Sequence, residues 1–202
     1  VDDRVHGSNL KISNLVNMLD RAKHDILVIA DSDMRVGRSY LQTVAAAFDD
    51  PHVSAATCLY SGSARDGLPS TLGAMFINDW FFPSALIAAL RDELAFCFGA
   101  TMAVRRGALE DIGGFAALVD VLADDYMLGN RVYRQGQKVA LVPYVVSNIV
   151  HEPSMSSLFL HEVRGARTIK NVKPLSYALS SITEGLFLSV VAAALLSFGG
   201  LS

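Results

Sequence analysis

The sequence Ile26-Leu27-Val28-Ile29-Ala30-Asp31-Ser32-Asp33 joins an apolar run directly to two acidic residues. The five apolar residues are rich in β-branched side chains, which is typical of a short buried strand. Open α/β sheets bind ligands beyond the carboxyl ends of their strands, where Asp31 and Asp33 would lie. Carboxylate oxygens in that place suit Mg²⁺ or Mn²⁺ attached to a diphosphate. An alternative role for this acidic tripeptide is to cap the helix that follows it.

The segments around this strand alternate between helical and extended patterns. Apolar spacing predicts helices over residues 11–22 and 39–48, a strand over 53–60, and a loop by composition over 61–69. Helix, strand, helix and strand in this order predict parallel βαβ units, and therefore an α/β fold with a mostly parallel sheet flanked by helices. Later elements are predicted as a turn and strand over 96–105, a helix over 122–135, strands over 139–142 and 144–150, and a helix over 158–169.

Residues 72–90 are strongly apolar and rich in aromatic side chains, Trp80 among them. Pro83 should interrupt a helix here, so the stretch is predicted to be too broken to span a membrane. A helix rich in Trp and Phe can lie at a bilayer interface or line an apolar acceptor pocket. An ordinary core helix is an equally good interpretation of the same pattern.

Composition excludes some classes of function. The chain has 202 residues, enough for one sizeable domain with an appendage, and its formal net charge of −3 argues against a nucleic-acid-binding protein. Cys58 and Cys97 stand among apolar residues, which does not indicate a disulfide framework. Hydrophobic residues make up 51% of the chain and the mean hydropathy is +0.35, which is high for a purely soluble protein.

The C-terminal end of the chain has the character of a membrane segment. Residues 185–202 carry no charge, and eighteen such residues are just long enough for a transmembrane helix. A basic stripe at helical spacing precedes them, formed by Arg164, Arg167, Lys170 and Lys173. Such a stripe beside a span places that side in the cytoplasm, although a solvated helix before a buried core helix is the alternative. We expect a domain over residues 1–173 and a membrane-associated segment over 174–202.

A second acidic pair, Asp124 and Asp125, opens a predicted helix. Acids at a sheet edge, a late acidic pair and a membrane anchor together suggest glycosyl transfer onto a lipid. A divalent ion held by Asp31 and Asp33 would neutralise the departing nucleoside diphosphate, and a late carboxylate would take the proton from the acceptor hydroxyl. The late pair is the candidate for that base, with N-capping as the simpler role for Asp124. Arg164 would grip the diphosphate or contact the membrane surface.

Several motifs occur in an order that resembles the ceramide glucosyltransferase branch of the family 2/21 glycosyltransferases, which have a GT-A fold. The bacterial hopanoid biosynthesis-associated glycosyltransferases are the most similar subgroup. The matching motifs cover residues 9–15, 31–36, 96–102, 112–115, 122–126 and 161–168. The resemblance extends over almost the whole chain and implies a Rossmann-like GT-A domain.

The resemblance also implies roles for individual residues. Asp31 and Asp33 match the metal–diphosphate motif, which implies Mg²⁺ or Mn²⁺ as cofactor, and Asp125 matches the presumed general base. The expected contacts to the donor and its diphosphate come from these two aspartates with Lys11, His161 and Arg164, although a plain exposed lysine is the alternative for Lys11. The expected acceptor pocket contains Trp80, Gly99, Ala100, Thr101 and Asp124.

The chain departs from the family pattern in two ways. The family signature around Arg164 continues with a Trp, and Gly165 stands in its place here. The family also carries an N-terminal membrane helix and an early acidic strand, and since this chain begins with Val1 we expect both upstream in a longer protein. His151-Glu152, which follows a predicted strand, is interpreted as structural.

These observations predict an inverting, metal-dependent glycosyltransferase that moves a hexosyl unit from a UDP-sugar to the hydroxyl of a membrane lipid. Bacteriohopanetetrol with N-acetylglucosamine is the preferred pair, and ceramide with UDP-glucose is the close alternative. A non-catalytic membrane-bound relative, favoured by Gly165, and a soluble sugar nucleotidyltransferase are the competing hypotheses. We expect the lipid bilayer as a partner, no nucleic acid, and a bacterial inner-membrane location with the catalytic domain facing the cytoplasm.

Overall fold

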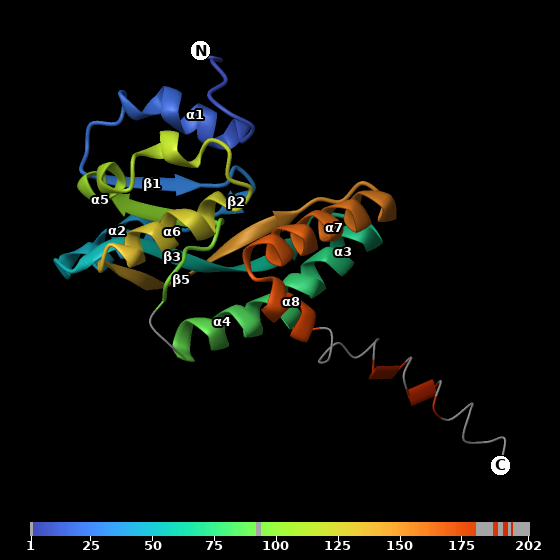
Figure 1. Ribbon diagram of the computed structural model, residues 1–202. Helices are drawn as coiled ribbons and strands as arrows, with labels where there is room; N and C mark the ends of the chain where they lie inside the picture. Colours follow the sequence, from blue (N-terminus) through green and yellow to red (C-terminus); the bar gives the residue numbers. More distant parts are fainter. Residues whose placement is uncertain (1, 92–93, 181–187, 190–191, 194, 196–202) are drawn as a thin grey trace. The chain divides into compact units, whose positions relative to one another are not determined.

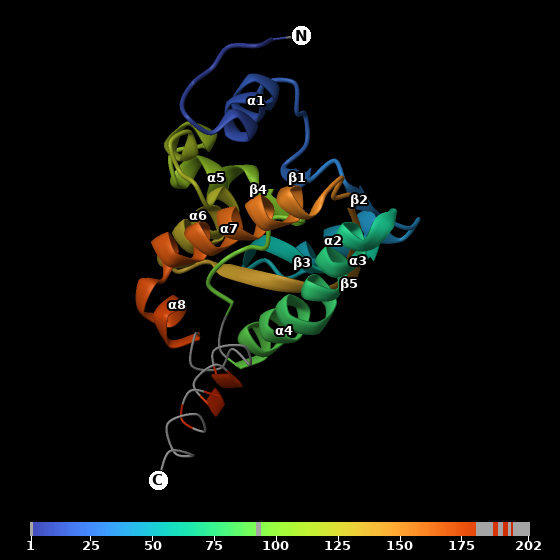
Figure 2. The ribbon, with the colours of Figure 1, turned by 90° about the vertical axis from the view of Figure 1, so that its right-hand side faces the viewer.

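The computed structural model describes residues 2–91, 94–180, 188–189, 192–193 and 195 (Figures 1 and 2). The chain divides into two compact units, Val1–Leu158 and Phe159–Ser202, and each is described here by itself. The first unit contains a five-stranded sheet, and both acidic motifs predicted above belong to it.

The sheet of the first unit is mixed rather than mostly parallel. Its strands follow the order β1 (Ile26–Ala30), β4 (Thr101–Arg105), β3 (Val53–Ala64), β5 (Lys138–Val150) and β2 (Met34–Arg35). β3 and β5 run parallel, whereas β1 with β4, β3 with β4, and β2 with β5 run antiparallel. β1, β3 and β5 therefore run in one direction, as the predicted parallel units require, and β4 and β2 run in the other. The prediction of a mostly parallel sheet fails at β4 and β2, because a short apolar run looks the same in a parallel and in an antiparallel neighbour.

Most predicted helices of the first unit form close to their expected positions. Outside the segment between β3 and β4, the helices of this unit are α1 (Leu10–Leu19), α2 (Tyr40–Ala46) with η1 (Ala47–Asp49), α5 (Arg106–Asp111), η3 (Phe115–Leu118) and α6 (Asp124–Arg134), of which the sequence does not predict α5 and η3. The helices predicted over 11–22, 39–48 and 122–135 are confirmed, with small shifts at their ends. Gly136 follows α6 and has a φ of 77°, in the left-handed region where glycine is favoured, and so terminates the helix.

A long helical segment follows β3 where the sequence predicts a loop and a broken helix. It consists of α3 (Gly67–Met75), the π-helical turn η2 (Phe76–Phe81) and α4 (Phe82–Arg91). Pro83 is tolerated because it lies just after the π turn, where the change in hydrogen-bond spacing accommodates a missing amide. The helical segment is continuous through Pro83, so the predicted break is wrong. By length and composition alone Gly67–Ala89 is apolar enough to cross a membrane, with a mean hydropathy of 1.3, a test that core helices of soluble proteins also pass.

β5 continues through Pro143, although the sequence predicts two separate strands on either side of it. The register between β3 and β5 shifts between Thr57 and Leu59, whose partners are Leu141 and Val145, and Pro143 lies in this irregularity. A proline fits there because the ladder does not require a hydrogen bond from its nitrogen. Beyond the irregularity, the parallel ladder extends to the last residues of both strands.

The two faces of the sheet carry separate apolar cores, covered by different helices (Figure 1). Met102 of β4 packs with Ile12 of α1 on one face, and the next residue, Ala103, packs with the α2 side. This alternation follows from the two-residue period of a strand. Cys58 and Cys97 are free thiols that belong to opposite cores, and burial raises the pKa of Cys58 to about 11. The α/β class with flanking helices is thus confirmed.

The second unit begins within a helix. α7 (Met155–Val172) confirms the helix predicted over 158–169 and carries most of the basic stripe, and α8 (Pro174–Ser180) follows it. The transmembrane segment predicted over 185–202 lies outside the described residues, apart from 188–189, 192–193 and 195, and stays a prediction.

Candidate active site

The turn after β1 presents the first acidic motif. The Ile149 amide of β5 donates to the Asp33 carbonyl at 2.8 Å, and the Asn148 side-chain amide donates to Asp33 Oδ2 at 3.0 Å. These bonds fix the turn as the connection between β1 and β2. Since α2 begins only at Tyr40, the alternative that the tripeptide caps a helix is wrong.

The second acidic motif opens α6 and is attached to the start of α1. The Asn9 side-chain amide donates to Asp124 Oδ1 at 3.1 Å and to the Val121 carbonyl at 2.9 Å. The Asn9 side-chain oxygen accepts from the Ile12 amide and so caps α1. Ala123 occupies the N-cap position of α6, so N-capping is not the role of Asp124.

Lys11 brings the two acidic motifs together. Its Nζ lies 2.7 Å from Asp31 Oδ1 and 3.6 Å from Asp124 Oδ2, although these aspartates are far apart in sequence. Burial works against the charge of Lys11, but the bond to Asp31 and the negative charges of Asp124, Asp31 and Asp125 prevail and raise the pKa of Lys11. Asp124 Oδ2 is buried and accepts no hydrogen bond among the described residues. The ammonium is therefore a shared counter-charge for both motifs.

Asp125 lies almost buried beside Gly99. A Cβ built on Gly99 would lie 3.0 Å from Asp125 Oδ2, so the lack of a side chain at Gly99 leaves room for the carboxylate. The pKa of Asp125 is raised, chiefly by burial and further by the negative charge of Asp124. The hydrogen bond from the Tyr126 amide and the positive charge of Lys11 lower the pKa and offset part of this rise. A carboxylate with a raised pKa is a stronger base at the pH where it is ionised, as general-base catalysis requires.

The other residues predicted for an acceptor pocket lie in different surroundings. Ala100 and Thr101 are buried in the sheet, where the hydroxyls of Thr101 and Tyr40 lie 3.0 Å apart. Trp80 belongs to η2 and stacks on Phe76 with ring centroids 4.8 Å apart. The structure thus places Ala100 and Thr101 in the core and Trp80 on the long apolar helix.

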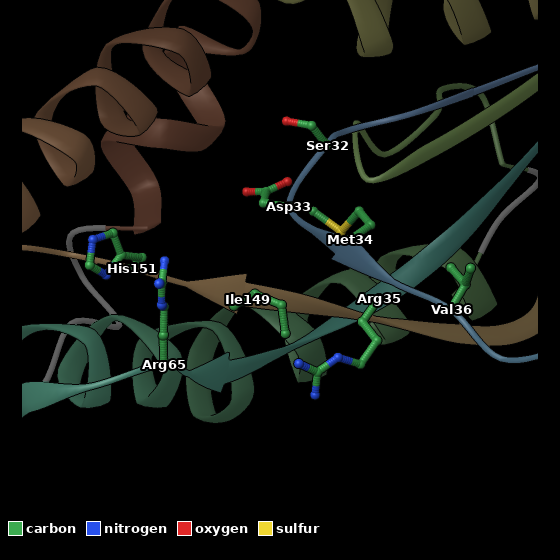
Figure 3. Close-up of a pocket in the computed structure, with 8 residues that line it drawn as sticks. All are labelled: Ser32, Asp33, Met34, Arg35, Val36, Arg65, Ile149 and His151. Carbon is green, nitrogen blue, oxygen red and sulfur yellow. The ribbon is translucent and has the colours of Figure 1, made fainter.

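A cavity of about 640 Å³ opens beside the first acidic motif (Figure 3). Its walls come from the turn after β1 and from the ends of β2, β3 and β5. The lining residues are Ser32, Asp33, Met34, Arg35, Val36, Arg65, Ile149 and His151. His151 Nδ1 lies 3.2 Å from an Asp66 carboxylate oxygen, which orients the imidazole ring at the rim.

The sequence does not predict Arg35 and Arg65 as site residues, and it predicts a structural role for His151. The missing signal is the parallel pairing of β3 with β5, which ends at Ala64 opposite Val150. Because of that pairing, Arg65 and His151 follow the two strands at the same edge of the sheet. A correct pairing of the two strands would have placed both residues next to the acidic turn.

The candidate metal ligands are Asp31 and Asp33. Among the residues that the structure describes, no group of three or more His, Cys, Asp or Glu side chains could hold an ion. Two hard carboxylates nevertheless fit a divalent ion that keeps waters and phosphate oxygens as its other ligands. Lys11 already forms an ion pair with Asp31. A metal ion would therefore either share the Asp31 carboxylate with the Lys11 ammonium or displace the ammonium from it.

Two predicted donor-binding residues, His161 and Arg164, belong to α7 in the second unit, and their role stays a prediction. At Gly165, a built Cβ meets nothing within 4 Å in the described part of the chain. Local space at this position therefore accepts a Cβ atom.

Comparison with known proteins supports the fold and the family of the chain. The mannosyltransferase PcManGT from Pyrobaculum calidifontis, solved in complex with GDP-Man and Mn²⁺, is similar in fold with a TM-score of 0.63 and 22% sequence identity. The match covers 93% of this chain and 54% of that protein, so the chain spans about half of its length. This likeness confirms the GT-A-like fold. The model of Glycosyl transferase family 21 matches residues 1–201, and the chain therefore belongs to that family.

Proposed function

We propose that the chain is part of an inverting, metal-dependent glycosyltransferase that moves a hexosyl unit from a UDP-sugar to the hydroxyl of a membrane lipid. The observation that carries this proposal is the position of Lys11, which contacts Asp31 of the first acidic motif and Asp124 of the second. A donor site and an acceptor base must lie side by side for direct transfer, and this contact joins the two.

The donor is proposed to bind at the first acidic motif. Asp31 and Asp33 would hold Mg²⁺ or Mn²⁺, and the ion supplies Lewis-acid neutralisation of the leaving diphosphate. Lys11 adds a fixed positive charge beside Asp31. The complex of the mannosyltransferase with GDP-Man and Mn²⁺ supports a nucleotide-sugar donor and a divalent ion.

Asp125 is proposed as the general base. The acceptor oxygen forms a bond to the anomeric carbon while the bond from that carbon to the diphosphate oxygen breaks, and the hydroxyl proton passes to Asp125. This single displacement inverts the anomeric centre. Burial beside Gly99 supports the role, because it raises the pKa of Asp125 and keeps competing water away.

The acceptor is proposed to be a lipid with a free hydroxyl. The apolar helix Gly67–Ala89, with exposed Phe76 and Trp80, and the uncharged residues 185–202 both support contact with a bilayer. Bacteriohopanetetrol with N-acetylglucosamine is our first choice, and ceramide with glucose is the alternative. The proposed location is the bacterial inner membrane, with the catalytic domain on the cytoplasmic side.

Transfer assays with the full-length protein test this proposal. Labelled UDP-N-acetylglucosamine, UDP-glucose and GDP-mannose would each be offered with bacteriohopanetetrol and with ceramide, with Mn²⁺ or with EDTA. We expect transfer from a UDP-sugar in Mn²⁺, its loss in EDTA, and its loss in Asp125→Asn. Asp49→Asn, an exposed control outside both motifs, should stay active. The absence of transfer to either lipid would contradict the proposal.

Gly165 favours a second candidate, a non-catalytic relative that binds a lipid or a partner. Release of UDP by the full-length protein, with glycine or with Gly165→Trp, discriminates between the two. If the glycine form already turns over and Asp125→Asn abolishes turnover, the non-catalytic candidate fails. If turnover requires Gly165→Trp, the natural chain is the binding protein.

A further inference from the structure

Two arginines line the cavity beside Asp33 without a protein partner. Within the described residues, neither the Arg35 nor the Arg65 guanidinium takes part in a hydrogen bond or an ion pair. The Arg105 guanidinium, in contrast, donates to the carbonyls of Val53 and Phe48. The donors of the two cavity arginines are therefore available to a ligand.

The strand order holds these arginines on either side of β5. Arg35 extends from β2 and Arg65 follows β3, and β5 lies between these strands in the sheet. Figure 3 shows Ile149 of β5 between the two arginine side chains. The backbone amide of Arg65 donates to the Val150 carbonyl at 2.9 Å, so the base of this arginine is fixed.

The charge and size of the cavity favour an anionic ligand. Two guanidinium groups and the Asp33 carboxylate line it, and the Asp66 carboxylate at the rim lies against His151, so the positive charge of the cavity is concentrated on the two arginines. A guanidinium presents paired N–H groups that match the oxygens of a phosphate. A volume of about 640 Å³ is within the ordinary range for small-molecule sites.

We propose that Arg35 and Arg65 form a phosphate subsite that works without a metal ion. Its ligand is the diphosphate of a nucleotide or the phosphate of an anionic lipid headgroup. The assignment to a sugar donor rests on the proposed function, whereas phosphate binding itself does not.

Calorimetric titration with inorganic pyrophosphate in EDTA tests the subsite. We expect binding by the natural chain and affinity about tenfold weaker or worse in Arg35→Ala and in Arg65→Ala. Arg38→Ala is the matched control, because Arg38 is exposed in the same segment but does not line the cavity. Arg65→Lys keeps the positive charge but loses the paired N–H donors of the guanidinium, so its affinity for pyrophosphate should lie between that of the natural chain and that of Arg65→Ala. No binding in EDTA, or equal weakening by Arg38→Ala, overturns the proposal.

Two further titrations distinguish the sources of the phosphate. Binding of UDP in EDTA that depends on both cavity arginines assigns the subsite to a nucleotide. Binding to phosphatidylcholine vesicles that contain phosphatidic acid, with the same dependence, assigns it to a lipid headgroup. If neither ligand depends on Arg35 and Arg65, the subsite is refuted. Asp125→Asn should keep pyrophosphate binding while it loses transfer, so failure of the proposed function alone is recognisable.

Discussion

Replacement of Gly129 with alanine should push α6 away from the segment that precedes β4. A Cβ at residue 129 would lie 2.4 Å from the Cys97 amide nitrogen and 2.5 Å from the Phe96 carbonyl carbon. Ordinary contact needs about 3.5 Å, so the helix and the facing backbone must separate by roughly 1 Å. Overpacking costs ~1–3 kcal/mol, and the backbone neighbours cannot rotate away, whereas alanine gains only ~1 kcal/mol in helix propensity. We expect a net loss of up to about 2 kcal/mol in the free energy of unfolding.

Gly107→Ala is the matched control for this substitution. Gly107 lies in α5, and a Cβ built there meets nothing within 4 Å in the described part of the chain, so only the gain in propensity of ~0.5–1 kcal/mol remains. Urea unfolding followed by circular dichroism should move the two midpoints in opposite directions. Since α6 begins at the acidic pair, the displaced Asp125 should also lose up to about 100-fold in transfer rate. Equal midpoints for the two variants would refute the reasoning.

Three further predictions concern the charges and packing of the first unit. Lys11→Met removes the cation that lowers the pKa of Asp125, so the acidic limb of the pH–rate profile of transfer should move to higher pH. The pKa of Asp125 is higher in the folded than in the unfolded protein, so ionisation of Asp125 lowers the free energy of unfolding as the pH rises through the folded pKa. Asp125→Asn lacks this ionisation, so its free energy of unfolding should fall less over the same pH range, as measured by urea midpoints at a series of pH values. Gly62→Ala would place a Cβ 2.8 Å from the Ala74 Cα, and the urea midpoint should fall by the equivalent of ~1–3 kcal/mol; an unchanged midpoint would show that α3 does not press on β3.

The fold was predictable wherever a local pattern carries the information. The β-branched run before Asp31 predicts β1, and the apolar spacing of α1, α2 and α6 predicts three helices. The loop predicted over residues 61–69 from glycine and proline is wrong, because β3 extends to Ala64 and α3 begins at Gly67. Pro69 instead lies in the first turn of α3, where a proline needs no partner for its nitrogen. Pro143 likewise sits in a register irregularity that only the partner strand reveals.

The acidic residues of the candidate site were predictable from the sequence, but the contacts between them were not. Asp31, Asp33 and Asp125 carry motif information, and Lys11 was expected near the donor. Its contacts with both acidic motifs, however, depend on how α1 is capped by Asn9 and attached to the loop before α6. No local pattern encodes a bond between residues so far apart in the chain.

The antiparallel pairing of β1 with β4, which the sequence does not predict, brings the candidate site residues together. β1 and β4 are antiparallel, and their ladder pairs Ala30, the last residue of β1, with Thr101, the first of β4. The carboxyl end of β1 therefore adjoins the residues that precede β4, where Gly99 leaves room for Asp125. If the two strands ran parallel, Asp31 would lie at the opposite end of β4, about 15 Å further along at the usual rise per residue. Antiparallel pairing thus places the end of β1 beside Asp125, as the proposed direct transfer from donor to acceptor requires.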